Sequence, residues 1–399
     1  MKVKSITCKN CTAMQKETLR SIGLLFLVLP LVFGLSQVAY PQFGLERQTQ
    51  EKKESEPDDQ FDLDDDDLDE ESEEPGDSSQ TESIENATVS ASSEPRIKGQ
   101  NGPKLGRTAT TAWETGFRLQ AVGRCTDIVT MITIPMDWPE QKVTIMEERE
   151  KTSSNVGRIL RQKHKNGGLE QMVVKFRELR AGQTAEAALV VKVTRHEILP
   201  PDPASIPKLS IPTTSKIPRA YRIYLDKSPN IESNNTQFRR LYAEITKGIE
   251  SDWAKVEAIY NYVRNNIQYN ERNAAKIGNG ALETLKLKEG DCKEMTALFI
   301  AICRAGKIPA RTVWVPGHCY VEFYMIDDDG IGYWFPCQVA GIYAFGGIPE
   351  MGPVLQKGDN FTFSELPREQ FRFVGQQITG QNEGGPAEKP KCVFFENQL

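Results

Sequence analysis

The sequence predicts an all-β domain followed by a domain that mixes helices with strands. Two observations lead to this expectation. Between residues 106 and 215, short β-rich runs alternate with turn residues, which is typical of an antiparallel sandwich. Beyond residue 215, apolar residues recur at helical spacing, and a strongly signalled helix precedes two alternating strands. A chain of 399 residues is long enough for two such domains with extensions.

Residues 1–36 are predicted to be a signal peptide. The apolar run from Ile22 to Leu35 follows several basic residues, and at 1.5 Å per residue it reaches only ~21 Å, short of a ~30 Å hydrocarbon core. Gly34 and Ser36 suit positions −3 and −1 of a cleavage site. We therefore expect an exported protein, periplasmic, cell-surface or secreted, which contacts a membrane only if this segment stays uncleaved as an anchor.

Residues 37–105 are predicted to form an acidic, disordered linker. Of the 55 acidic residues, 19 lie between Glu51 and Glu94, where Lys52 and Lys53 are the only bases, so the rest of the chain is net basic. Such a segment buries too little apolar surface to offset its ordering entropy. An acidic run can bind cations or a basic partner, but a solvated spacer is the simpler interpretation.

The all-β domain is placed at residues 106–215 and shows no catalytic pattern. His164 lies in a basic stretch that is expected to be a solvated turn, and His196 closes a strand, so both are expected to be structural or exposed. A Pro-rich connector, residues 200–218, marks the domain boundary. The predicted strands include 129–134, 142–146, 172–176 and 187–194.

The second domain is placed at residues 216–375, and residues 376–399 are treated as a tail that could add a last strand. An early helix has one face in the core, because its apolar residues recur at three- and four-residue spacing. These residues are Trp253, Val256, Ile259, Tyr260, Val263 and Ile267.

A later helix carries the candidate nucleophile, Cys292. Asp291 is a suitable N-cap, Glu294 completes a capping box, and Gly306 suits the position after the last turn. Cys292 is therefore the first helical residue, where the positive end of the helix dipole favours thiolate over thiol. Cys303, further along among apolar residues, is expected to belong to the core.

The candidate base is His318, one of only three histidines in the chain. It begins an alternating strand that ends at Ile326. If a hairpin pairs Ile326 with Gly330, His318 falls opposite Gln338. The side-chain carbonyl of Gln338 could then orient the imidazole as the third member of a triad.

The same register sets Cys319 opposite Cys337, either as a cross-strand disulfide or as two buried thiols. A zinc site that adds Cys292 and His318 to these cysteines is disfavoured, because adjacent strand residues point to opposite faces. We expect no metal and no cofactor, since cofactor motifs are absent from the sequence. Nucleic-acid binding is not expected either, because the basic residues are scattered without interleaved aromatics.

Several of these segments resemble the core of the transglutaminase-like superfamily: Gly290-Asp291-Cys292, the helix ending near Arg311, His318–Phe323 and Trp334–Pro336. The resemblance covers roughly residues 220–345, and the β domain resembles the sandwich that often precedes this core. It implies a papain-like α+β fold, in which the helix bearing Cys292 packs on an antiparallel sheet, with Cys292 as nucleophile and His318 as base. The family usually has Asp where this chain has Gln338, and a neutral amide stabilises an imidazolium less than a carboxylate does.

The expected function is that of an exported cysteine-nucleophile enzyme acting on amide or peptide bonds of a protein or peptide substrate. Cys292 would attack the carbonyl with His318 as base, its backbone N–H would help bind the oxyanion, and a thioester would form. Tyr269 is a candidate second oxyanion donor from its position alone. Attack by an amine would give crosslinking, whereas water would give deamidation or proteolysis. The alternative is a catalytically weak or inactive scaffold protein of the cell envelope, which the neutral Gln338 favours.

Overall fold

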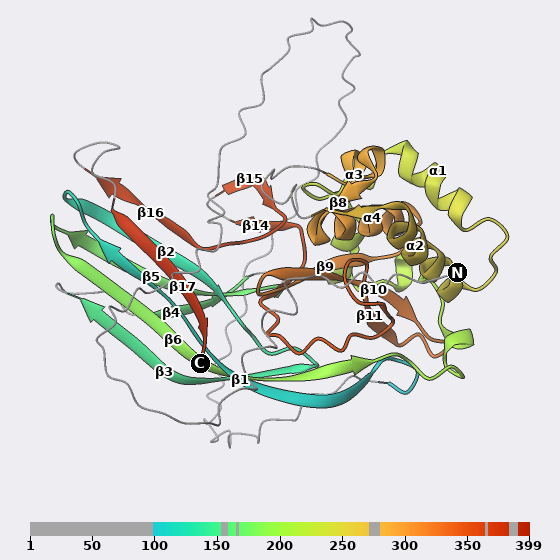
Figure 1. Ribbon diagram of the computed structural model, residues 1–399, viewed down its shortest axis with the longest axis horizontal. Coiled ribbons are helices and arrows are strands. Elements are labelled where there is room, and N and C mark those ends of the chain that lie inside the picture. The colour runs from blue at the N-terminus through green and yellow to red at the C-terminus, as the bar shows by residue number, and fades with distance from the viewer. Residues whose placement is uncertain (1–98, 153–158, 165–166, 271–279, 364–365, 383–389) are drawn as a thin grey trace, which may run out of the picture. The chain divides into compact units, whose positions relative to one another are not determined.

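The computed structural model describes residues 99–152, 159–164, 167–270, 280–363, 366–382 and 390–399 (Figure 1). The predicted signal peptide and the predicted acidic linker up to residue 98 lie outside these residues. The end of that linker lies inside them, and strand β1 begins at Lys104. Among the helices of the described segments, none has the length and apolarity needed to cross a bilayer.

The N-terminal part of the described chain is rich in strands, which form two four-stranded antiparallel sheets (Figure 1). Side chains from both sheets share one buried apolar cluster, in which the rings of Phe117 and Phe176 meet edge to face at 5.9 Å. The strands are β1 (Lys104–Gln120), β6 (Thr184–Leu199), β3 (Gln141–Thr152) and β17 (Lys391–Gln398) in one sheet, and β2 (Cys125–Ile134), β5 (Glu170–Leu179), β4 (Leu160–Lys163) and β16 (Gln377–Asn382) in the other.

The four predicted strand runs lie within β2, β3, β5 and β6. The segment after residue 376, treated as a tail in the sequence analysis, supplies an edge strand to each sheet: β17 pairs with β1, and β16 pairs with β2. The expectation of a solvated turn at His164 was wrong. This imidazole is 8% exposed, bonds the carbonyl of Thr362 at 2.8 Å and packs against Phe361, because the later part of the chain covers it.

Helices follow the Pro-rich connector, in which the 3-10 helices η1 (Ile206–Lys208) and η2 (Thr214–Lys216) lie, with η3 (Arg219–Leu225) just beyond it. All six predicted core residues, five on α2 (Asp252–Asn266) and Ile267 directly after it, are buried at 6% exposure or less, so that prediction is confirmed. The bounds of α4 also agree with the predicted start and end signals. The helices are α1 (Thr236–Ile245), α2 (Asp252–Asn266), α3 (Ala281–Leu287) and α4 (Cys292–Ala305).

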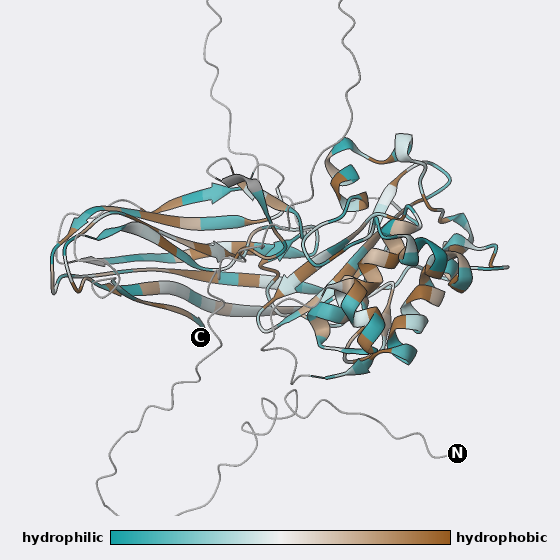
Figure 2. Cartoon of the chain, turned by 90° about the horizontal axis from the view of Figure 1, so that it is seen from above, coloured by the Kyte–Doolittle hydropathy of each residue, from teal (hydrophilic) through white to brown (hydrophobic). Residues whose placement is uncertain are grey.

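A five-stranded antiparallel sheet, in the order β12-β11-β10-β9-β13, packs against α4. Alternation along β10 divides its side chains: Cys319, Val321, Phe323 and Met325 join the cluster under the helices, whereas Tyr320 joins a second cluster on the other face. Figure 2 shows apolar and polar residues alternating along the strands. The bounds are β9 (Ala310–Val315), β10 (His318–Ile326), β11 (Gly332–Gln338), β12 (Ala344–Phe345) and β13 (Gln356–Lys357).

Two short pairs complete the described strands. β7 (Gln268–Tyr269) runs parallel to β8 (Glu289–Gly290), and β14 (Phe361–Phe363) is antiparallel to β15 (Leu366–Phe371). The β7–β8 pair ties the end of α2 to the residues that lead into α4, and therefore helps to fix where α4 begins.

The predicted register of the β10–β11 hairpin was wrong by two residues. Ile326 pairs with Gly332 rather than with Gly330. The reason is Asp327, whose buried carboxylate accepts the N–H groups of Asp329 and Ile331 and holds these residues out of the ladder. Because the shift is an even number, every side chain keeps its predicted face.

A buried network of charges lies on the face of the core sheet opposite α4. Lys357 forms ion pairs with Glu322 and, at 2.7 Å, with Glu140. Glu322 also pairs with Arg311 at 2.7 Å. Arg195 lies 3.6 Å from Glu140. Burial alone would raise the pKa of Glu322, but Lys357 and Arg311 lower it to about 2. Glu140 and Arg195 come from the strand-rich region and the other three from the core sheet, so the network joins the two.

We predict that Lys357→Met destabilises the protein by about 3–5 kcal/mol, because Glu140 and Glu322 would then be left buried without their shared cation. The measurement is the free energy of unfolding by urea. Lys104→Met is the matched control, since its ion pair with Asp202 is half exposed and should be worth about 0–1 kcal/mol. Equal losses in the two variants would contradict the prediction.

Candidate active site

The start of α4 is fixed by a complete capping box. The carboxylate of Asp291 accepts the backbone N–H groups of Lys293 at 2.8 Å and of Glu294 at 3.2 Å, and the Glu294 carboxylate accepts the N–H of Asp291 at 2.9 Å. Gly290 leaves room for this arrangement, because a Cβ there would lie 2.8 Å from that of Glu294. Cys292 is consequently the first residue of the helix, as predicted.

Cys292 and His318 lie together. Cys292 is 9% exposed and belongs to the cluster between α4 and the sheet, while His318 is the first residue of β10 and pairs across the ladder with Val315 of β9. The two groups act on each other: the imidazole lowers the pKa of the thiol, and the thiol raises the pKa of the imidazole. The nucleophile and base predicted from sequence are therefore neighbours, one from a helix start and one from a strand start.

The surroundings favour the charged forms of both groups. The pKa of Cys292 lies well below its usual value because Cys319 and His318 hydrogen-bond the thiolate, an effect that exceeds the opposing effect of burial. Burial lowers the pKa of His318, yet its hydrogen bond with Cys292 and the nearby carboxylates of Glu350 and Asp291 leave that pKa raised. Each group therefore favours the charged form of the other.

The sequence did not reveal the role of Cys319, for which a pairing with Cys337 and a disfavoured zinc site were the interpretations considered. Both cysteines are free thiols. Cys319 faces α4, where its Sγ lies 3.8 Å from Oγ1 of Thr296, one helical turn after Cys292. Burial and the adjacent Cys292 raise the pKa of Cys319 well above its usual value, which favours the thiol form of Cys319 beside Cys292. The alternation of β10 put Cys319 under the helices, but only the packing reveals what it touches.

Gln338 is near His318 but not bonded to it. Continuing the observed register by one pair sets Gln338 opposite Tyr320, diagonal to His318 on the same face. Oε1 of Gln338 and Nε2 of His318 are both buried and have no hydrogen-bond partner within the described part of the chain. Arg264 of α2 donates to the backbone carbonyl of Gln338 at 2.9 Å, which holds the end of β11 in place. The predicted direct pairing of Gln338 with His318 is thus corrected to a diagonal one.

Tyr269, proposed from position alone, lies on β7 opposite Gly290 and is 41% exposed. This puts it beside the residues that lead into Cys292. Within the described residues, no group of three or more His, Cys, Asp or Glu side chains is arranged to hold a metal ion.

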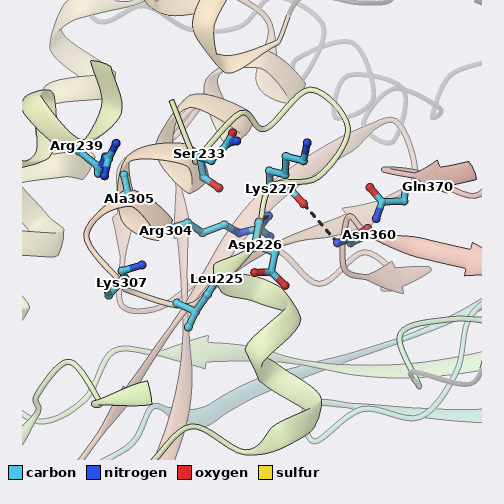
Figure 3. A pocket seen from close by; sticks show the side chains of 11 residues that line it. Leu225, Asp226, Lys227, Ser233, Arg239, Arg304, Ala305, Lys307, Asn360 and Gln370 are labelled. Atoms are coloured by element: carbon cyan, nitrogen blue, oxygen red, sulfur yellow. Dashed lines mark hydrogen bonds between the residues drawn. The ribbon is translucent and has the colours of Figure 1, made fainter. Parts of the chain in front are cut away.

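A cavity of about 540 Å³ lies elsewhere, around the C-terminal end of α4 (Figure 3). Arg304, Lys307, Asp226 and Asn360 are among the residues that line it. Arg304 is twelve positions after Cys292, roughly 18 Å along the helix at 1.5 Å per residue. This cavity is therefore separate from the Cys292–His318 pair.

Comparison with known proteins relates part of this chain to a family. Residues 239–339 match the transglutaminase-like superfamily. A solved structure from Cytophaga hutchinsonii, described as a putative cysteine protease, is 16% identical, covers 74% of this chain and 93% of its own, and has a TM-score of 0.51. A second, a putative protease from Parabacteroides distasonis, is 15% identical, covers 58% and 47%, and has a TM-score of 0.24. No curated protein sequence matches.

The matched segment contains Cys292, His318 and Gln338, and the likeness to the first of these structures supports the same mixed helix-and-strand fold with a strand-rich N-terminal region. The resemblance read from the sequence is confirmed. The chain carries a transglutaminase-like domain at residues 239–339.

Proposed function

We propose that this protein is a cysteine-nucleophile enzyme that cleaves amide or peptide bonds of proteins through a thioester. The observation that carries the proposal is the pairing of Cys292, whose pKa is strongly lowered, with His318, whose pKa is raised. A thiolate held beside an imidazolium near neutral pH combines a nucleophile with a general acid for the leaving group.

In the proposed reaction, the thiolate of Cys292 attacks the substrate carbonyl. The backbone N–H of Cys292 is one of the unpaired donors of the first turn of α4 and helps to stabilise the oxyanion. Tyr269 is the candidate for a second donor. His318 protonates the departing amine and leaves a thioester on Cys292, and His318 then serves as base for the incoming water or amine.

Water and amine lead to different products, hydrolysis or crosslinking. The description of the Cytophaga hutchinsonii structure as a putative cysteine protease supports hydrolysis, and the transglutaminase-like match supports acyl transfer as well. For the substrate we propose a protein or peptide. We also propose that the protein is exported, on the basis of the apolar segment preceding Gln37.

A second candidate function is that of a binding or scaffold protein of the cell envelope with little or no catalysis. The specific observation that favours it is Gln338. Its amide is neutral and does not hydrogen-bond His318, so it cannot stabilise an imidazolium as a carboxylate would.

We predict that Cys292 of the full-length protein is alkylated rapidly by iodoacetamide at pH 6. An ordinary thiol with a pKa of ~8.5 is almost entirely protonated there, whereas the lowered pKa of Cys292 keeps it a thiolate. Site-resolved mass spectrometry over pH 5–9 measures the rate of alkylation at each cysteine.

His318→Ala should slow the alkylation of Cys292 at pH 6. Cys303, buried with a raised pKa, is the internal control. An ordinary rate at Cys292 would favour the scaffold function.

We predict that Cys319→Ala slows alkylation of Cys292 at pH 6 by roughly tenfold or more. A hydrogen bond to a charged group is worth about 1.5–3 kcal/mol, and its loss should raise the pKa of Cys292. Cys337→Ala removes an equally buried thiol from the same cluster and should leave the rate unchanged. A similar rate change in both variants would mean that packing, rather than the hydrogen bond, is responsible.

The reaction itself is tested by incubating the full-length protein with casein, with and without a fluorescent primary amine. We predict a Cys292-dependent product: new peptide termini, or ammonia released without incorporation of the amine, indicates hydrolysis, and fluorescent casein indicates acyl transfer. Cys292→Ala should abolish it, and Cys303→Ala is the matched control. If wild type and Cys292→Ala give the same products, the proposed chemistry is wrong.

A further inference from the structure

The imidazole of His318 lacks, within the described residues, the carboxylate partner that the transglutaminase-like family usually has at the position of Gln338. Its Nε2 is buried without a hydrogen-bond partner in the described segments, and the neighbouring Gln338 offers only an amide oxygen that is itself unpaired. The negative charge that stabilises the imidazolium on the side away from Cys292 must therefore come from another residue.

The chain between β12 and β13 brings a carboxylate to this position. Ile348 exchanges two backbone hydrogen bonds with Ile198 at the end of β6, of 2.9 and 2.7 Å, and the N–H of Val354 is bound by the side chain of Gln141 at 2.6 Å. These two attachments fix both ends of the short segment that contains Glu350.

That segment lies against the strands next to His318. Ile348 and Val354 belong to the same buried cluster as Tyr320, two residues after His318, and as Val315, the cross-strand partner of His318. Glu350, between the two anchors, is thereby held on the His318 side of the sheet. Its carboxylate forms no hydrogen bond or ion pair within the described residues and is only partly exposed.

The other charged groups near His318 are already engaged. Cys292 is the thiolate partner, and Asp291 caps α4 and pairs with Lys293 at 3.3 Å. Arg195, whose charge lowers the pKa of Glu350 as that of His318 does, already belongs to the buried network with Glu140 and donates to the hydroxyl of Tyr320 at 3.0 Å. Burial raises the pKa of Glu350, and the charge of His318 opposes that rise, so the two groups act on each other electrostatically while Glu350 has no hydrogen-bond or ion-pair partner in the described segments.

We propose that Glu350 is a positioning residue that supplies, from the β12–β13 segment, the negative charge that Gln338 does not provide, and so stabilises the imidazolium form of His318. This inference rests on the proposed function. It also explains how the Cys292–His318 pair can function with a neutral residue at position 338. The carboxylate would come from the segment between β12 and β13 instead of from β11.

The test is the titration of the three histidines by NMR of the full-length protein labelled at histidine Cε1, with His318→Ala used to assign the His318 signal. In Glu350→Gln, we expect the midpoint of His318 to shift to lower pH, because loss of the nearby charge destabilises the imidazolium. The midpoints of His164 and His196 should not move. Glu396→Gln, which removes a similarly buried carboxylate from β17, is the matched control.

The double variant Glu350→Gln, Gln338→Asp distinguishes charge from packing. A carboxylate at position 338 should return the His318 midpoint toward the wild-type value, which a purely structural role of Glu350 would not allow. Glu350→Ser serves the same comparison if Glu350→Gln does not fold. An unchanged His318 midpoint in Glu350→Gln, or no recovery in the double variant, overturns the inference. If Cys292 of the wild type does not react with iodoacetamide, the proposed function fails. The titration of His318 is a separate measurement and still tests the role of Glu350.

Discussion

The candidate active site depends on the N-terminus of helix α4 and the first residue of strand β10 lying next to each other. The capping box of Asp291 and Glu294 fixes where α4 begins, and the ladder of β9 and β10 fixes where His318 lies. Because the helix start carries partial positive charge and unpaired N–H groups, a thiol placed there is already disposed to ionise. The imidazole of His318 and the thiol of Cys319 then complete the stabilisation of the thiolate.

The two faces of the core sheet have different tasks. One face packs against the helices through apolar residues and holds Cys319 under Cys292. The opposite face carries the network of Glu140, Arg195, Glu322 and Lys357, which is fully buried and joins the sheet to the strand-rich region. Burying charge in this way adds little to stability by itself, but it strongly disfavours any arrangement that separates the partners. The network thus holds the β6 end, and with it the attachment point of Ile348, in register with the sheet.

This coupling makes the strand-rich region part of the environment of the site. Ile198 and Gln141 belong to the β6 and β3 strands, and they anchor the two ends of the segment that carries Glu350. The C-terminal strands β16 and β17 close the edges of the same two sheets. The segment that carries Glu350 is therefore positioned by parts of the chain more than a hundred residues away.

The sequence by itself determined the elements whose signals are local: the amphipathic face of α2, the capped start of α4 at Cys292, and the alternation of β10 that separates Cys319 from His318. It also carried the motifs of the transglutaminase-like domain. The β10–β11 register was decided by the buried carboxylate of Asp327, which widens the turn, so Gln338 lies diagonal to His318 rather than opposite it. Only the tertiary structure brought Cys319 to Cys292, and the segment of Glu350 to the strands beside His318. It also paired the C-terminal strands with the first two sheets. These contacts join distant segments through packing, and they leave no periodic pattern along the chain.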